Sequence, residues 1–303
     1  MASDDLIQKL KTALGPQGVL TGKDAEEKAQ GGWSNLGVPA AVLRPANTDE
    51  VSKALKLAHA AGESIVPWGG KTGLVEGGEA DGHIALSLDR MNKIEEIDAT
   101  GGTMTVGAGC VLQAICEAAD EKGLFFPLDL GSRGSATIGG NISTNAGGNR
   151  VIRYGMTRDM VLGLEAVLAD GTVMNSMNRL IKNNAGYDLK HMFIGSEGTL
   201  GIVTRAVLRL RPKPVSQDTG FVAVESFEAL PKFLRHMERA LGGALSAFEV
   251  MWEDFYKLVT SEPAKGRPVV AHGHPYYVLV ESMGGAREAD AARFEAAMMD
   301  ALE

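Results

Sequence analysis

Residues 67–78 read PWGGKTGLVEGG and hold five glycines in twelve residues. They follow a short apolar run, residues 64–66, which predicts a strand that ends in a glycine-rich turn. Glycine at such a turn lets the backbone approach a ligand closely. The Gly-Lys-Thr within the segment suggests a nucleotide phosphate as that ligand. Which nucleotide fits depends on the spacing of the other glycines.

The two best-known phosphate-binding motifs do not fit this spacing. A Walker A loop requires a glycine five residues before Gly70, where Ile65 stands, and a helix directly after the loop. A dinucleotide fingerprint would begin at residues 107–109, GAG, but Leu112 occupies the place of its third glycine. The sequence therefore disfavours ATP, GTP or NAD bound through either motif.

Two further glycine clusters favour another way of holding a diphosphate. Residues 131–148 read GSRGSATIGGNISTNAGG, with Arg133 as the only charge, and residues 195–201 read GSEGTLG. Backbone amides of glycine-rich turns can bind an anion without a lysine. Hydroxyl and amide side chains can contact phosphate, ribose or a heteroaromatic ring. A tightly packed loop would explain a single cluster better than a ligand does, whereas three clusters favour a ligand.

Length, composition and charge exclude several classes of protein. The 303 residues are 45% hydrophobic and carry a formal net charge of −8, which predicts a globular protein of one large or two medium domains. No basic run indicates nucleic-acid binding, and no apolar run approaches the ~18 residues of a membrane span. The start, MASDDLIQKL, lacks the apolar core of a signal peptide, and Cys110 and Cys116 fit buried thiols better than a disulfide. We therefore expect a cytoplasmic protein.

The hydrophobic pattern predicts mixed α and β structure. We expect a β-α-β unit over residues 40–68, with Asn47 or Thr48 capping its helix. Residues 160–175 predict a hairpin that turns at residues 170–171, Asp-Gly. Two prolines in RPKP, at 212 and 214, indicate a domain boundary. Beyond it, the strands FVAVE and PYYVLVE and two helices predict an α+β segment with an antiparallel sheet.

Four segments, in order and spacing, resemble one flavoprotein family. They are PWGGKTGL (67–74), PLDLGSRGSATIGGNISTNAGGNRVIRYG (127–155), VLGLEAVLADGTV (161–173) and KNNAGYDLKHMFIGSEGTLGIVT (182–204). The series resembles the FAD domain of the p-cresol methylhydroxylase (PCMH)/vanillyl-alcohol oxidase flavoproteins, and within them the D-2-hydroxyacid dehydrogenases that act on D-2-hydroxyglutarate, D-lactate or glycolate. The resemblance implies an α+β fold. It places a PCMH-type FAD-binding domain of two α+β subdomains at 1–212, with its core at 38–212, and part of a substrate (cap) domain at 213–303.

The resemblance also implies which residues hold the cofactor, largely through their backbone. The first loop would wrap the FAD diphosphate, residues 131–147 would follow the ribityl chain and the rest of the cofactor, and residues 197–203 would lie near the adenine or its ribose. The implied residues are Pro67, Trp68, Gly69, Gly70, Lys71, Thr72, Gly73, Leu74, Ser132, Gly134, Ser135, Thr137, Gly139, Asn141, Thr144, Asn145, Gly147, Glu197, Gly198, Ile202 and Val203. The first loop lacks the histidine that tethers the flavin in some relatives, so non-covalent FAD is expected.

The implied chemistry is oxidation of a small D-2-hydroxy acid to the 2-oxo acid, with hydride transfer to flavin N5 and an electron acceptor other than NAD. Relatives of this kind run well past 303 residues, and their later part supplies a histidine base, metal ligands and a substrate-binding arginine. We therefore assign no catalytic residue and no metal ligand. The alternatives are an FAD-binding electron-transfer subunit or an inactive fragment; among enzymes, a reductase of the same FAD fold that acts on a cell-wall precursor is the runner-up.

Several residues keep two interpretations. Arg150, Arg153 and Arg158 could bind a phosphate or a substrate carboxylate, or they are surface charges. Trp68 either stacks near a flavin or fills the core. The pair His272 and His274 could bind a metal, although loop histidines explain it better.

If residues 213–303 form only part of a cap domain, some of its apolar faces are expected to lack packing partners. We expect such exposure at Phe221, Val222, Tyr277, Val278 and Phe294. Exposed apolar faces promote association, so we expect a homo-oligomer.

Overall fold

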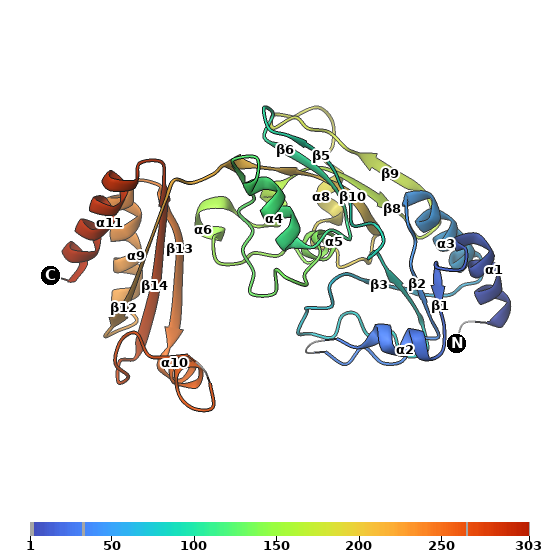
Figure 1. Ribbon diagram of the computed structural model, residues 1–303, viewed down its shortest axis with the longest axis horizontal. Coiled ribbons are helices and arrows are strands. Elements are labelled where there is room, and N and C mark those ends of the chain that lie inside the picture. Colours follow the sequence, from blue (N-terminus) through green and yellow to red (C-terminus); the bar gives the residue numbers. More distant parts are fainter. Residues whose placement is uncertain (1–2, 32–33, 265, 303) are drawn as a thin grey trace. The chain divides into compact units, whose positions relative to one another are not determined.

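The computed structural model describes residues 3–31, 34–264 and 266–302, which divide into two compact units (Figure 1). The first unit comprises residues 1–146 and 156–212, and the second comprises residues 147–155 and 213–303. The last passage of the chain between the units thus lies at Pro212, within the proline-rich segment RPKP. Within the described ranges, no helix is long and apolar enough to span a membrane.

The first unit begins with a four-stranded sheet of order β1-β2-β4-β3. Its strands are β1 (Val19–Leu20), β2 (Ala41–Leu43), β3 (Ile65–Trp68) and β4 (Ile84–Ser87), and its helices are α1 (Asp4–Leu14), α2 (Lys23–Ala29) and α3 (Thr48–Ala60). The side chain of Asn47 caps α3 by accepting a hydrogen bond from the Glu50 N–H, as the sequence predicts. The expected β2-α3-β3 unit is present, but β4 lies between its two strands and runs parallel to both.

A second, antiparallel sheet completes the first unit, with the order β5-β6-β10-β8-β9. Its strands are β5 (Ile94–Asp98), β6 (Thr103–Gly107), β8 (Val161–Val167), β9 (Val173–Ser176) and β10 (Ile202–Arg209). The accompanying elements are α4 (Leu112–Asp120), β7 (Leu124–Phe125), α5 (Ile138–Ser143), α7 (Thr157–Met160), α8 (Lys190–Phe193) and β11 (Arg211–Pro212). The predicted hairpin is confirmed: β8 pairs with β9, and Gly171 takes a φ of 82° in the turn.

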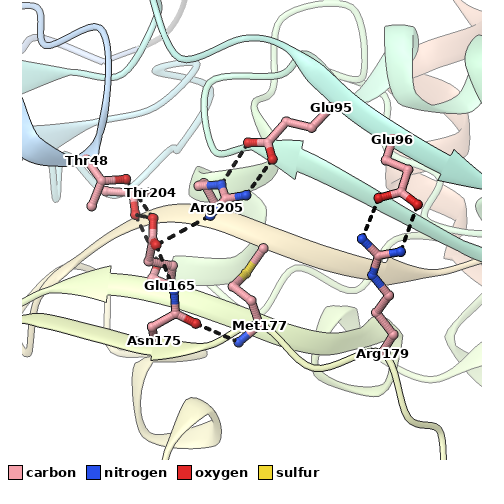
Figure 2. Close-up of polar contacts among 9 residues, drawn as sticks. All are labelled: Thr48, Glu95, Glu96, Glu165, Asn175, Met177, Arg179, Thr204 and Arg205. Carbon is pink, nitrogen blue, oxygen red and sulfur yellow. Dashed lines mark hydrogen bonds and ion pairs between the residues drawn. The ribbon is translucent and has the colours of Figure 1, made fainter.

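A buried carboxylate on β8 ties α3 to this second sheet (Figure 2). Glu165 accepts hydrogen bonds from the hydroxyls of Thr48 at 2.6 Å and Thr204 at 2.9 Å. Arg205 lies 3.5 Å from the same carboxylate and pairs with Glu95 through its other nitrogens. Because the buried carboxylate has several partners, its burial is compensated, and it holds α3 against the second sheet.

The second unit contains a three-stranded antiparallel sheet with β14 (Tyr276–Gly284) between β12 (Ser216–Val224) and β13 (Leu245–Trp252). Helices α9 (Ala229–Leu241) and α11 (Arg287–Leu302) lie along one face (Figure 1), and α6 (Val151–Tyr154) and α10 (Glu253–Thr260) complete the unit. The strands expected at FVAVE and PYYVLVE fall in β12 and β14, and the antiparallel sheet is as predicted.

The expectation of unpartnered apolar faces in this unit is wrong. The residues concerned are Phe221, Val222, Tyr277, Val278 and Phe294. Val278 and Phe294 belong to a buried hydrophobic cluster, and Val222 packs against that cluster. On the opposite face, the rings of Tyr277 and Phe221 lie 4.0 Å and 5.4 Å from the ring of Tyr256 on α10. Helices α9, α10 and α11 thus supply partners within the unit, so these residues give no support for an oligomer.

Asp89, just after β4, provides a pH-dependent contact in the first unit. Its carboxylate accepts hydrogen bonds from Lys28 Nζ at 2.5 Å and Arg44 Nε at 3.1 Å. Burial acts to raise the pKa of Asp89, but the hydrogen bonds and charges of Lys28 and Arg44 outweigh it and hold the pKa below the ordinary 3.8. A carboxyl whose folded pKa is depressed stabilises the fold above its unfolded pKa, and this stability is lost as the pH falls through the folded pKa.

We therefore expect Asp89→Asn to lower the free energy of unfolding at neutral pH and to lose less stability than the native chain below about pH 4. Urea unfolding at a series of pH values measures both effects. Parallel stability curves for the two proteins below that pH would contradict the assignment.

Candidate functional site

The three glycine-rich segments meet at a cavity of about 500 Å³ in the first unit. The loop after β3 forms one part of its wall, α5 and the residues before it form a second, and the segment that leads into β10 forms a third. Segments more than a hundred residues apart thus line one space. Its volume falls within the range of cofactor and small-molecule pockets, roughly 300–1,000 Å³.

Most of the sequence-predicted cofactor residues lie in this wall. They are Pro67, Trp68, Gly69, Gly70, Lys71, Thr72, Gly73, Leu74, Ser132, Thr137, Gly139, Asn141, Thr144, Glu197, Gly198, Ile202 and Val203. The structure does not bring Gly134, Ser135, Asn145 and Gly147 into the described lining. Gly147 belongs to the second unit, and the Asn145 side chain instead accepts a hydrogen bond from the Arg158 N–H at 2.9 Å.

The wall also contains residues that the sequence-based list does not name. Some lie within the predicted segments: residues 75–78, Ala136, Gly140, Ser143, Ala146 and Gly201. The others, Ser34, Leu36, Leu88 and Leu130, lie outside them. Leu36 and Leu88 carry no signal of a ligand site, because their sequence context is that of ordinary core leucines.

Two of the lining glycines also allow close packing within the wall. A Cβ added at Gly70 would lie 2.1 Å from the Ser135 carbonyl oxygen, so Gly70 allows two segments of the wall to touch. Gly198 takes a φ of 82°, and a Cβ there would lie 2.4 Å from Pro67 Cγ. Gly73 differs, since an added Cβ would meet no atom within 4 Å. Gly70 thus allows close packing of the wall and also lines the cavity, as the sequence predicts.

Asn141, on α5, carries an unsatisfied buried polar atom in the wall. The residue is 6% exposed, and its Oδ1 has no hydrogen-bond partner among the residues that the structure describes. A buried acceptor without a donor costs about 1–3 kcal/mol. A ligand donor in the cavity would remove that cost.

The titratable side chains in the described wall are Lys71, Glu76 and Glu197. The Lys71 ammonium donates hydrogen bonds to two backbone carbonyls, Lys28 O at 2.5 Å and Gln30 O at 2.7 Å. Burial, followed by the nearby Lys28 charge, lowers the pKa of Lys71, and Asp89 acts in the opposite direction. Lys71 is thus occupied by backbone carbonyls, which agrees with the exclusion of a Walker loop.

Trp68 fills the core, which is one of its two interpretations, and it also lines the cavity. Its ring packs in a buried cluster with Leu36 and Ala85. Its Nε1 donates a hydrogen bond to Gly78 O at 2.6 Å.

The three arginines form structural contacts in different units. In the second unit, Arg150 binds the Glu281 carboxylate at 3.0 and 3.2 Å, and Arg153 donates to the Ala244 and Met283 carbonyls. In the first unit, Arg158 donates to His191 O at 2.7 Å. Each of the three thus has a protein group as its partner.

The two C-terminal histidines also have protein partners. His272 Nε2 lies 2.8 Å from Thr260 Oγ1, and His274 Nδ1 lies 2.7 Å from Glu225 Oε1. Among the described residues, no group of three or more His, Cys, Asp or Glu side chains could hold a metal ion. Cys110 and Cys116 are both thiols, with Cys110 buried and Cys116 partly buried, and burial raises the pKa of Cys110 to about 11.

Comparison with known proteins identifies the family. Residues 39–176 match the FAD binding domain family. The chain is 40% identical over 300 residues to the mitochondrial D-2-hydroxyglutarate dehydrogenase of Arabidopsis thaliana, covering 98% of this chain and 54% of that protein. A putative mitochondrial D-lactate dehydrogenase of Schizosaccharomyces pombe is 39% identical over 274 residues, covering 89% of this chain and 52% of that protein. The chain thus spans about half the length of these relatives.

Solved structures support the same fold. Alkyldihydroxyacetonephosphate synthase is 20% identical and superposes with a TM-score of 0.80 over 100% of this chain and 59% of its own. p-Cresol methylhydroxylase is 18% identical, with a TM-score of 0.78 over 99% of this chain and 64% of its own. These matches confirm the mixed α+β fold predicted from the four sequence segments. The chain therefore carries a domain of the FAD binding domain family at residues 39–176, and it is related to the D-2-hydroxyglutarate and D-lactate dehydrogenases.

Proposed function

We propose that the chain binds FAD non-covalently in the cavity of the first unit, as the FAD-binding part of an oxidoreductase that converts a D-2-hydroxy acid into the 2-oxo acid. One observation carries the cofactor proposal: three glycine-rich segments converge on a cavity whose wall contains the unsatisfied Asn141 Oδ1. When bound, FAD supplies the electron acceptor for the oxidation.

The wall suits a long, polar, anionic cofactor. The backbone of the first loop and the hydroxyls of Ser132 and Thr137 offer hydrogen-bond donors, whereas the Thr144 hydroxyl donates to Gly140 O at 3.0 Å and offers an acceptor. Asn141 Oδ1 offers an acceptor to a donor group of the ligand. The described lining contains no histidine, cysteine, tyrosine or aspartate, which are nucleophilic side chains able to form a covalent tether. These features support non-covalent binding.

The substrate class rests on the relatives. The relatives named after D-2-hydroxyglutarate and D-lactate are 40% and 39% identical to this chain, over 98% and 89% of its length. Both compounds are α-hydroxy carboxylates of D configuration, which is the class that we propose. A second candidate is an FAD-binding module whose substrate-binding groups lie on another polypeptide. It is favoured by the arginines, because Arg150, Arg153 and Arg158 already bind protein groups.

Anaerobic mixing separates the two candidates. The FAD-loaded chain is mixed with D-2-hydroxyglutarate or D-lactate, each with its L-enantiomer as the control, or with achiral glycolate, and the visible flavin absorbance is followed. Bleaching by a D-acid and not by its enantiomer supports oxidation by this chain. A flavin that stays oxidised for many minutes with every acid, yet is reduced at once by dithionite, contradicts it and favours the second candidate. Loss of a positioned base alone slows such a step roughly 10²–10⁴-fold.

A further inference from the structure

Lys71 has a backbone conformation that is unusual for its side chain. Its φ is 55°, in the left-handed region that glycine adopts without strain and other residues rarely do. It follows Gly70 in the loop that lines the cavity. A residue stays in such a conformation only where its surroundings hold it there. For Lys71, these surroundings are the groups that its side chain contacts.

The Lys71 ammonium is attached to the end of α2. Its hydrogen bonds to Lys28 O and Gln30 O, at 2.5 and 2.7 Å, use carbonyls in the last turn and at the C-cap of that helix. The final carbonyls of a helix have no partner within it, and a cation near them is also favoured by the helix dipole. Lys71 therefore satisfies two carbonyls of α2 and fixes the start of the loop.

Trp68 fixes the other end of the same loop. Its indole Nε1 donates to Gly78 O, and its ring centroid lies 5.5 Å from Lys71 Nζ, a cation–π distance. Between these two anchors the loop makes fewer contacts: Ser34 Oγ donates a hydrogen bond to Gly73 O at 2.5 Å, whereas the side chains of Leu74 and Val75 are 74% and 83% exposed. The shape of residues 69–78 thus depends on a small number of contacts, and those of the Lys71 ammonium hold its start.

We propose that Lys71 is a positioning residue that holds the first glycine loop in the shape that receives the cofactor. Its ammonium acts on the protein backbone and not on the phosphates. This inference rests on the proposed binding of FAD. Ordering a loop on binding costs conformational entropy, which lowers the affinity for the ligand. A loop that is already ordered avoids this cost, so Lys71 raises the affinity for FAD without contacting it.

The first test replaces Lys71 by methionine, which keeps a similar apolar stem and removes the ammonium. We expect the dissociation constant for FAD, measured by quenching of flavin fluorescence, to rise about 10–100-fold, as expected when charge-assisted hydrogen bonds that order a loop are lost. Lys53→Met, at an exposed position of α3, is the matched control and should bind FAD as the native chain does.

A chemical rescue separates positioning from a folding defect. Lys71→Cys is purified as a folded protein and then treated either with 2-bromoethylamine, which rebuilds a lysine-like ammonium, or with iodoacetamide, which leaves a neutral side chain. The native chain, which contains Cys110 and Cys116, receives both treatments as the control. We expect the ammonium to restore most of the affinity for FAD and the neutral group to restore none.

Three outcomes count against the inference. Unchanged FAD affinity in Lys71→Met overturns it and leaves the proposed function standing. An Lys71→Met protein whose FAD affinity has also lost its dependence on salt would show that Lys71 is a phosphate-binding cation, which overturns the positioning role. A native chain that does not bind FAD refutes the proposed function, and the inference with it.

Discussion

Replacement of Gly73 by glutamate is expected to weaken FAD binding at least about 100-fold while leaving the fold intact. A Cβ at Gly73 meets no atom within 4 Å, and its φ is not positive, so the backbone accepts a side chain. The new carboxylate would lie in the cavity wall beside the proposed diphosphate. Two like charges about 5 Å apart repel by roughly 3 kcal/mol at an effective dielectric constant of 20, which is at least about 100-fold in affinity.

The control for this variant is Gly285→Glu. Gly285 is an exposed glycine of the second unit at which a Cβ likewise meets no atom within 4 Å. Both variants add the same charge, so any difference in FAD affinity arises from the position. Gly70→Glu is unsuitable, because its Cβ would collide with the Ser135 carbonyl and disturb the wall itself. Native-like FAD affinity in Gly73→Glu would place the diphosphate elsewhere.

Arg150→Met is expected to destabilise the second unit by about 3–5 kcal/mol, because it leaves a buried carboxylate without its cation. The side chains of Arg150 and Glu281 are only 13% and 9% exposed. Glu281 would keep the hydrogen bonds from Gln217 and Ser246, at 2.6 and 2.8 Å, and these do not neutralise its charge. Equilibrium unfolding in urea measures the loss.

Two control variants show whether the loss of stability in Arg150→Met comes from the unpaired buried carboxylate. The double variant Arg150→Met/Glu281→Leu removes both charges and should be more stable than Arg150→Met alone. Arg235→Met breaks an exposed ion pair with Glu238 and should cost less than about 1 kcal/mol. If Arg150→Met cost no more than Arg235→Met, the buried pair would not stabilise the unit.

Features set by neighbouring residues could be predicted from the sequence. Asn47 caps α3, and Asp170-Gly171 turns the β8–β9 hairpin, because capping and tight turns depend on a few adjacent residues. The four glycine-rich and hairpin segments also indicated the family, since their order and spacing are highly specific.

Features set by distant partners could not be predicted. The insertion of β4 between β2 and β3 is a choice of pairing that no local pattern specifies. Arg150 looks like a ligand-binding cation until its partner, Glu281, is known. The close contact of Gly70 with the Ser135 carbonyl was also not predictable, because a glycine has the same sequence signature whether its backbone meets a ligand or another segment. The sequence likewise suggested apolar cap residues without partners, where α9, α10 and α11 in fact supply them.

The most direct test of the central claim, that the cavity of the first unit binds FAD non-covalently, is the visible spectrum of the purified 303-residue chain before and after acid precipitation. The account predicts the two visible bands of an oxidised flavin, directly or after addition of FAD, and about one FAD per chain. Acid should leave a colourless pellet and a yellow supernatant that contains intact FAD. A colourless protein that fails to take up added FAD, or a pellet that retains the yellow colour, would contradict it.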